Sequence, residues 1–147
     1  MIACPPSVVF QKLADVGSIK EWAPVVMNSS CIEDKGGEGT RFAIDFDLKQ
    51  VGGPKFHFDN VVAESVRDRK VVWRQTKGPM KEIAWLFELT PTEREATKVA
   101  ATIEYKMPYS ILGRLMDKLK MNRVIDGACS VNLDGLKIRL EGTAPAR

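Results

Sequence analysis

Hydrophobic residues recur every three or four positions through the last third of the chain, after Pro108 and Ser110. This spacing is typical of an amphipathic α-helix, and it predicts one long helix of about 30 residues, roughly 45 Å at 1.5 Å per residue. The apolar stripe of this helix consists of Leu112, Leu115, Leu119, Cys129, Leu133, Leu136 and Leu140. A helix with one such stripe packs that face against another layer of the protein.

Two polar residues, Asn122 and Asp126, interrupt this stripe one helical turn apart. A buried carboxylate needs a hydrogen-bond donor, water or a ligand, so the pair predicts a polar site, with Arg123 as a cation for an acidic ligand group. An alternative is that the helix is rotated at Gly127, since a glycine in mid-helix costs about 1 kcal/mol relative to alanine and indicates a packing or bending role. The buried face would then be formed by Met121, Ile125 and Ala128.

The chain before this helix reads as two short helices followed by a run of strands. Pro5-Pro6 fits the first turn of a helix that continues to Ala14, and a second short helix ends at Trp22. Alternating apolar and polar positions bounded by turn residues predict strands at 25–32, 40–50, 55–66, 71–76, 82–89 and 98–107. A long terminal helix across a curved antiparallel sheet encloses a cavity, and the polar break in the helix falls where that cavity should be.

Composition narrows the class of protein. A chain of 147 residues, with 44% hydrophobic and 28% charged residues, fits one globular domain, 1–147, with a loose tail at 141–147. No apolar run reaches the ~20 residues of a membrane span and no signal segment opens the chain, so we expect a cytoplasmic protein without stable membrane insertion. A net charge of +3 is too weak to indicate nucleic-acid binding.

Few residues suggest cofactor or metal chemistry. Cys4, Cys31 and Cys129 are odd in number and far apart, which favours free thiols over a disulfide or a zinc site. The glycine-rich stretch 36–39 lacks the lysine of a phosphate-binding loop and lies between two strands, so it is interpreted as a turn. We expect no metal and no cofactor.

His57 is the only histidine, and Asp59 follows it on the same face of a predicted strand. On a cavity wall such a pair could serve as a general base with its orienting partner, which makes His57, together with Asp126, a weak catalytic candidate. The simpler interpretation assigns Phe56 and Phe58 to the core face and leaves His57 and Asp59 in solvent.

Aromatic residues on the last strands predict the walls of a small-molecule pocket, because such pockets combine aromatic walls with a few polar groups. Trp22 is expected near the mouth of the cavity, and Gln75 is expected to supply a hydrogen bond inside. Any single member of this set could instead simply fill the core. With the polar residues of the helix, the expected ligand-binding set is Trp22, Phe46, Trp73, Gln75, Trp85, Phe87, Tyr105, Met116, Leu119, Asn122, Arg123 and Asp126.

Several segments carry a family resemblance over almost the whole chain. They are the opening 2–10, Leu13-Ala14-Asp15, Trp22-Ala23-Pro24, the turn 37–41, Leu89-Thr90-Pro91-Thr92 with Thr97, and the final helix. In these segments the chain resembles the START-like (SRPBCC, helix-grip) superfamily of Bet v 1-type allergens, polyketide cyclase/dehydrase proteins and lipid-transfer START domains. The resemblance implies an α+β helix-grip fold, in which a curved antiparallel sheet of about six to seven strands wraps around the C-terminal helix.

The resemblance also implies a function class, the binding of apolar or amphipathic small molecules. We therefore favour a carrier of a lipid, isoprenoid, quinone or polyketide-like molecule. A cyclase or dehydratase, with Asp126, Asn122 or His57 steering proton transfer, is the first alternative, and a protein-interaction module is the second.

The start of the chain departs from the family pattern. Such domains open with a full strand, of which only Met1-Ile2-Ala3 is present. Either the true start lies upstream or the sheet lacks an edge strand. Because an open edge invites strand pairing, a homodimer through that edge is a further hypothesis.

Overall fold

The order of helices and strands follows the predicted one. The computed structural model of the chain describes residues 1–53, 55–106 and 118–142, with the main chain alone at 118 and 119. Its elements are α1 (Pro6–Ala14), the 3₁₀-helix η1 (Val16–Glu21), β1 (Val26–Glu33), β2 (Arg41–Asp47), the 3₁₀-helix η2 (Lys49–Val51), β3 (Lys55–Val66), β4 (Lys70–Lys77), β5 (Glu82–Pro91), β6 (Thr97–Lys106) and α3 (Lys118–Gly142). The strand predicted at 40–50 ends at Asp47, because the chain then turns into η2.

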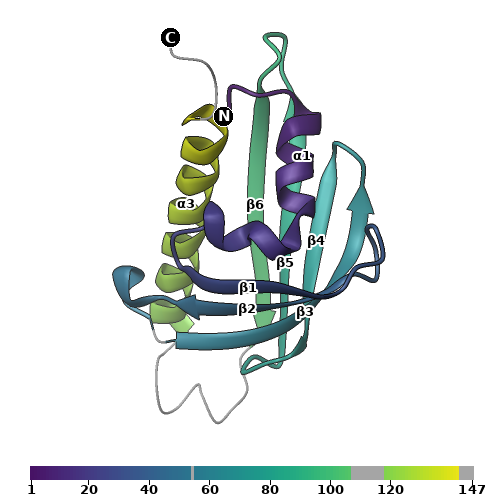
Figure 1. The fold of residues 1–147 in the computed structure, drawn as a ribbon. Helices are drawn as coiled ribbons and strands as arrows, with labels where there is room; N and C mark the ends of the chain where they lie inside the picture. The colour runs from purple at the N-terminus through teal and green to yellow at the C-terminus, as the bar shows by residue number, and fades with distance from the viewer. Residues whose placement is uncertain (54, 107–117, 143–147) are drawn as a thin grey trace.

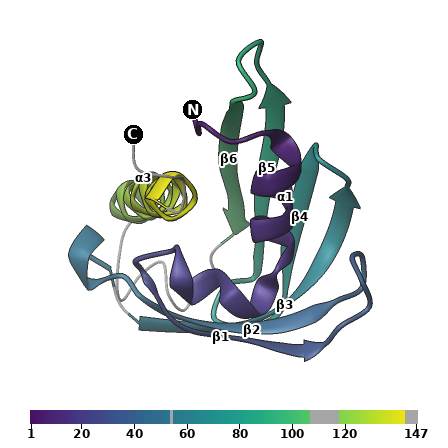
Figure 2. The same ribbon diagram turned by 45° about the horizontal axis from the view of Figure 1, so that its top comes forward.

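The strands form one antiparallel sheet in the order β1-β2-β3-β4-β5-β6. Register shifts in the β1–β2 and β3–β4 pairs mark irregularities that bend the sheet, and Figures 1 and 2 show it strongly curved. The helices α1 and η1 lie in the hollow of the sheet, and α3 runs along its open side (Figure 2). The predicted α+β helix-grip fold is confirmed.

The inward face of the sheet forms the core. On β2 the alternation predicted from the sequence holds, because the inward side chains are less than 5% exposed. The inward side chains of β5 are at most 6% exposed. These residues are Phe42, Ile44 and Phe46 on β2, and Ile83, Trp85, Phe87 and Leu89 on β5. Aromatic rings therefore make up much of the floor beneath the helices.

The N-terminal segment closes the top of the core. Pro6 occupies the first helical position of α1, where no amide hydrogen is needed, and α1 buries Val9 and Leu13 completely. Ahead of this helix, Ile2 makes a two-way main-chain bridge with Thr97 at the start of β6, with both N···O distances 2.8 Å. Ile2 thus lies beside β6, an outer strand of the sheet. Pairing of a second chain along this edge stays a prediction.

The rotation of α3 differs from the predicted leucine stripe. Its buried side chains are Met121, Val124, Ile125, Ala128, Asn132, Leu136 and Leu140, while Asn122, Cys129 and Leu133 are half-buried. The expectation that Asp126 lies inside the buried face is wrong, since it is exposed. The alternative rotation holds, and its cause is packing against the η2 segment: a Cβ at Gly127 would lie 3.1 Å from Val51, and one at Gly53 would lie 2.7 Å from Val124.

Two expectations concern the rest of α3. The loose tail was predicted at 141–147; its first two positions, 141 and 142, belong to α3, and residues 143–147 lie outside the described part. The leucines at 112 and 115 also lie outside it. Across the described ranges, no helix has both the length and the apolarity needed to cross a bilayer.

Candidate functional site: an apolar cavity between the sheet and α3

A small cavity lies between the inward face of the sheet and the first half of α3. Its volume is about 10 Å³, roughly that of one water molecule. All of the surface it exposes is apolar. The lining residues are Phe46, Leu48, Phe56, Phe58, Met80, Ile83, Trp85, Ile125 and Ala128.

Strand pairing sets the aromatic wall of this cavity. Phe46 on β2 and Phe56 on β3 are directly opposite each other, and the ring of Phe46 stacks on Trp85 of β5 with centroids 5.2 Å apart and planes 3° apart. Phe58 meets Phe46 edge to face at 5.4 Å. The ring contacts of Phe46 with Trp85 and Phe58 join three strands, so we expect a change of cavity size to come from the other lining residues, Phe56 among them.

Three further predicted aromatic residues, Trp22, Trp73 and Phe87, are buried but do not line the cavity. Trp73 pairs directly with Trp85 across the β4–β5 ladder and packs against Phe87 at 4.8 Å. Trp22 is 3% exposed and lies 6.5 Å from both Trp73 and Phe87, so the expectation that it sits at the cavity mouth is wrong. The turn after η1 places it under α3, in the interior.

Gln75 is tied to its own turn. Its Nε2 donates to the main-chain oxygen of Met80 at 2.7 Å, and its Oε1 accepts from the Met80 amide at 3.3 Å. The side chain therefore braces the β4–β5 turn and holds Met80 in place beside the cavity. In this state its amide group is not directed at a ligand.

A polar seam joins β6 to α3 next to the cavity. The hydroxyl of Tyr105 donates to Oδ1 of Asn122, which brings two predicted site residues together. Burial and the nearby charge of Asp126 raise the pKa of Tyr105. Burial, with the same charge as a smaller cause, raises the pKa of the Cys129 thiol to about 11. The seam thus gathers Tyr105, Asn122, Asp126 and Cys129 on the side of α3 that faces β6.

Three of the predicted ligand-binding residues remain, namely Arg123, Met116 and Leu119. Arg123 is exposed on α3. Met116 lies outside the described residues, as does the side chain of Leu119. Their predicted ligand contacts stay predictions.

His57 lies on the outer face of the sheet, as the simpler interpretation expected. The protonated ring can donate from Nδ1 to Oδ1 of Asp45 at 2.5 Å and from Nε2 to Oδ1 of Asp59 at 2.9 Å. These hydrogen bonds, with Asp45 as the larger cause, raise the pKa of His57. The imidazole is 57% exposed and points away from the cavity that Phe56 and Phe58 line.

The described residues contain no cluster of histidine, cysteine and acidic side chains with the geometry of a metal site. Cys4, Cys31 and Cys129 are all free thiols.

Two buried asparagines were missed in reading the sequence. Asn60 is 2% exposed and Asn132 is 7% exposed. Among the described residues, Oδ1 of each asparagine has no hydrogen-bond partner, and neither does Nε1 of Trp22 or of Trp73. A buried polar group without a partner costs about 1–3 kcal/mol. The signal was present: Asn60 alternates with Phe58 and Val62, and Asn132 lies four residues after Ala128 and four before Leu136.

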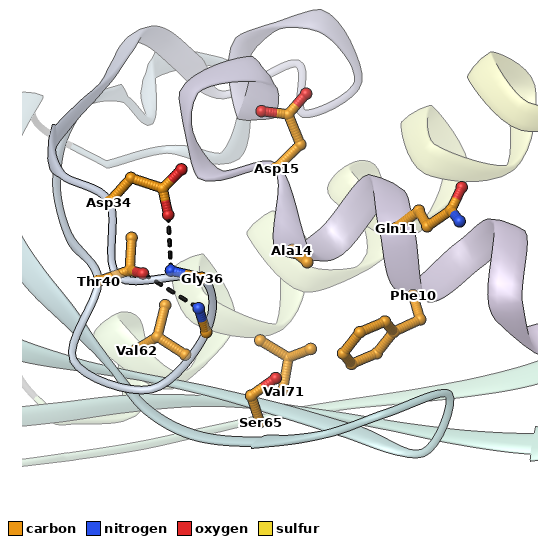
Figure 3. A pocket seen from close by; sticks show the side chains of 11 residues that line it. Phe10, Gln11, Ala14, Asp15, Asp34, Gly36, Thr40, Val62, Ser65 and Val71 are labelled. Atoms are coloured by element: carbon orange, nitrogen blue, oxygen red, sulfur yellow. Dashed lines mark hydrogen bonds between the residues drawn. The ribbon is translucent and has the colours of Figure 1, made fainter.

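A second hollow of about 370 Å³ lies between α1 and the turn that precedes β2 (Figure 3). Two of its polar side chains make hydrogen bonds within that turn: Oδ1 of Asp34 accepts from the Gly36 amide at 2.8 Å, and Oγ1 of Thr40 accepts from the Gly37 amide at 3.3 Å. The φ angles of Gly36 and Gly37, 73° and 143°, are ones that glycine adopts without strain. The stretch 36–39 is thus a turn, as predicted.

The comparisons with known proteins agree with this geometry. Residues 1–141 match the family described as polyketide cyclase / dehydrase and lipid transport. The chain belongs to this family. A search of curated proteins found no relative.

Solved structures show the same fold at low sequence identity. The protein TTHA0849 from Thermus thermophilus is 19% identical with a TM-score of 0.81, over 97% of this chain and 94% of that one. The Zhui aromatase/cyclase from Streptomyces sp. R1128 is 17% identical with a TM-score of 0.80, over 95% and 88%. A START superfamily protein from Mycobacterium smegmatis is 14% identical with a TM-score of 0.76, over 97% and 94%.

Proposed function

We propose that this member of the family binds a small hydrophobic molecule, such as a lipid, isoprenoid, quinone or polyketide-like compound, between the sheet and α3. The observation that carries the proposal is the wholly apolar, aromatic-walled cavity at the position where the helix grips the sheet. Burial of apolar surface is the main source of affinity in such a site, about 25 cal/mol per Å². The family description, which includes lipid transport, supports the same function.

Binding requires the cavity to widen. A cavity of about 10 Å³ holds no organic molecule, so lining side chains must move outward. Met80 and Phe56 are the candidates, because Met80 is unbranched and flexible and Phe56 is only half-buried. Phe56 also lines an open hollow of about 480 Å³ whose lining includes His57, Asp59 and Lys77, so Phe56 borders both this hollow and the cavity. A ligand would enter past Phe56.

The positions of the two weak catalytic candidates, His57 and Asp126, favour a carrier over an enzyme. His57 faces away from the cavity, and Asp126 is exposed. Neither is placed to exchange a proton with a molecule held among Phe46, Trp85 and Ala128.

Native mass spectrometry of the protein as purified from cells, followed by extraction of what it carries, tests this proposal. We expect an added mass of a few hundred daltons in the wild type and its loss in Ala128→Leu, which fills the cavity. The matched control is Ala63→Leu, at an exposed position on β3, which should keep the added mass. Both variants should first give the circular dichroism of the wild type. An empty wild type that also binds no added apolar compound would contradict the proposal, and a co-purifying protein would favour an interaction module.

Cyclase or dehydratase activity is the second candidate function. The polar seam favours it, because Tyr105 and Asn122 are hydrogen-bonded beside Ile125, which lines the cavity. The fold shared with an aromatase/cyclase and the family description support it. The test is conversion of a poly-β-keto thioester, with Tyr105→Phe and Asn122→Leu expected to abolish turnover while binding of the thioester persists. Equal turnover in these variants and the wild type would exclude the seam as the catalytic group.

A further inference from the structure

The open hollow beside Phe56 lies where the sheet has a gap. Pairing between β3 and β4 begins with Asp59 and Lys77, so the residues of β3 before Asp59 extend past the end of β4. These residues form one wall of the hollow, and the β4–β5 turn, through Gly78 and Pro79, forms the other. The hollow has a volume of about 480 Å³.

Both walls of the hollow continue into the apolar cavity. On β3, Phe56 lines both spaces and Phe58 lines the cavity. On the turn, Pro79 lines the hollow and the next residue, Met80, lines the cavity. A molecule that passes Phe56 into the cavity therefore leaves its outer end between the start of β3 and the β4–β5 turn.

Each wall of the hollow carries an exposed lysine, Lys55 on β3 and Lys77 at the end of β4. Lys55 is four residues from Asp59 on the same strand, and Lys77 is directly opposite Asp59, so the three side chains leave the same face of the sheet. Four residues of a strand span about 13 Å, and each lysine has a flexible four-carbon stem. Both ammonium groups can therefore reach one small group placed between them.

Neither lysine takes part in an ion pair within the described part of the chain. Asp47 lies opposite Lys55, but its Oδ1 accepts from the main-chain amide two residues further on, at 3.0 Å. Asp59 lies opposite Lys77, but its Oδ1 is 2.9 Å from Nε2 of His57. The two cross-strand ion pairs that the register allows are thus not formed, and both ammonium groups are left to the hollow.

One negative charge balances the charges of the hollow. The charged side chains that line it are Lys55, Lys77 and Asp59, with His57 as the titratable group beside Asp59. With a neutral imidazole, the lysines exceed the acidic residue by one charge. A carboxylate balances this charge, a phosphate dianion exceeds it, and an ammonium group would be repelled.

We propose that the ligand is an amphipathic acid, whose apolar body lies in the cavity and whose carboxylate lies in the hollow between Lys55 and Lys77. The inference rests on the proposed binding function and deepens it, since it assigns a head group and an orientation to the ligand. The carboxylate stays at the surface and keeps part of its hydration, so it avoids the cost of burying a charge. Phe56 then lies beside the junction of the head group and the apolar body.

Three probes with the same apolar chain separate this inference from the proposed function. Decanoate, 1-decanol and decylammonium end in a negative, a neutral and a positive group at neutral pH. In titration calorimetry we expect the wild type to bind decanoate about tenfold more tightly than decylammonium, because the two lysines attract one ion and repel the other. Equal affinities for the two ions, or a preference for decylammonium, would overturn the carboxylate inference and leave the binding function standing. Binding of none of the three would overturn both.

Variants locate the head group. Lys55→Gln and Lys77→Gln remove one charge each from an exposed side chain, and each should weaken decanoate binding about threefold while the affinity for 1-decanol is kept. The matched control is Lys98→Gln, which removes the same charge from an exposed position on β6 and should change neither affinity. All variants should first give the circular dichroism of the wild type. Unchanged decanoate binding in the double variant, or an equal loss in the control, would show that the carboxylate binds elsewhere and would overturn the assignment.

Discussion

The main-chain oxygen of Trp22 lies directly against Gly135 of α3. A Cβ atom at Gly135 would come within 2.0 Å of that oxygen and within 2.7 Å of the ring of Pro24. The main chain of α3 at Gly135 thus packs directly against the main chain of the segment after η1.

We expect Gly135→Ala to destabilise the protein. Alanine gains about 1 kcal/mol in helix propensity, but overpacking at a tight contact costs about 1–3 kcal/mol, and the rigid carbonyl places this site at the upper end. A net loss of about 1–2 kcal/mol in the free energy of unfolding should appear in urea denaturation. Gly142→Ala is the control, since nothing lies within 4 Å of its Cβ position. Wild-type stability of Gly135→Ala would contradict the close approach.

The cavity should respond to Met80. Met80 is 4% exposed and lines the cavity, so Met80→Ala should enlarge it, at a cost of about 2–5 kcal/mol in stability. Affinity for 2-methylnaphthalene, measured by calorimetry, should rise, because less side chain must be displaced. Met27→Ala, at a position 48% exposed on β1, should change neither quantity. Unchanged affinity in a folded Met80→Ala would mean that ligands do not enter this cavity.

Local periodicity predicted the strands and the core well. The β3 range matches the structure because Phe56, Phe58 and Val62 face one side at a period of two, and the same rule placed His57 in solvent. Whether a segment forms a turn or a strand depends largely on the residues next to it in the chain, and these can be read from the sequence.

The rotation of α3 could not be predicted in the same way. Two faces of this helix are apolar enough to be buried, one along the leucines and one through Met121, Ile125 and Ala128. The choice between them depends on Val51 and Gly53, which are far away in the sequence and pack on Gly127 and Val124. For the same reason the asparagine that faces the interior is Asn132, whereas Asn122 reaches Tyr105 on β6.

The pair of carboxylates beside His57 makes the stability of the protein pH-dependent. The pKa of His57 is raised in the folded state. The stabilisation is therefore fully present below the pKa of the unfolded state, about 6.5, and is lost as the pH rises through the pKa of the folded state. The ring is exposed, so we expect only about 0.2–1 kcal/mol from the charge interactions. The difference in unfolding free energy between wild type and His57→Gln should shrink between about pH 6 and pH 8. Because His57 is the only histidine, its titration by proton NMR is direct, and a pKa at or below about 6.5 would contradict the contacts with Asp45 and Asp59.

The three thiols should differ in reactivity. Cys31 is exposed on β1, whereas burial and the charge of Asp126 raise the pKa of Cys129 to about 11. At pH 8 a thiol with that pKa is ionised to about one part in a thousand, and only the thiolate attacks an alkylating agent. Iodoacetamide followed by peptide mass mapping should therefore label Cys31 first and Cys129 last. Asp126→Asn should speed labelling of Cys129 by lowering its pKa, and Cys31→Ser should remove only the fast phase. Labelling of Cys129 as fast as Cys31 would mean that α3 does not bury this thiol against β6.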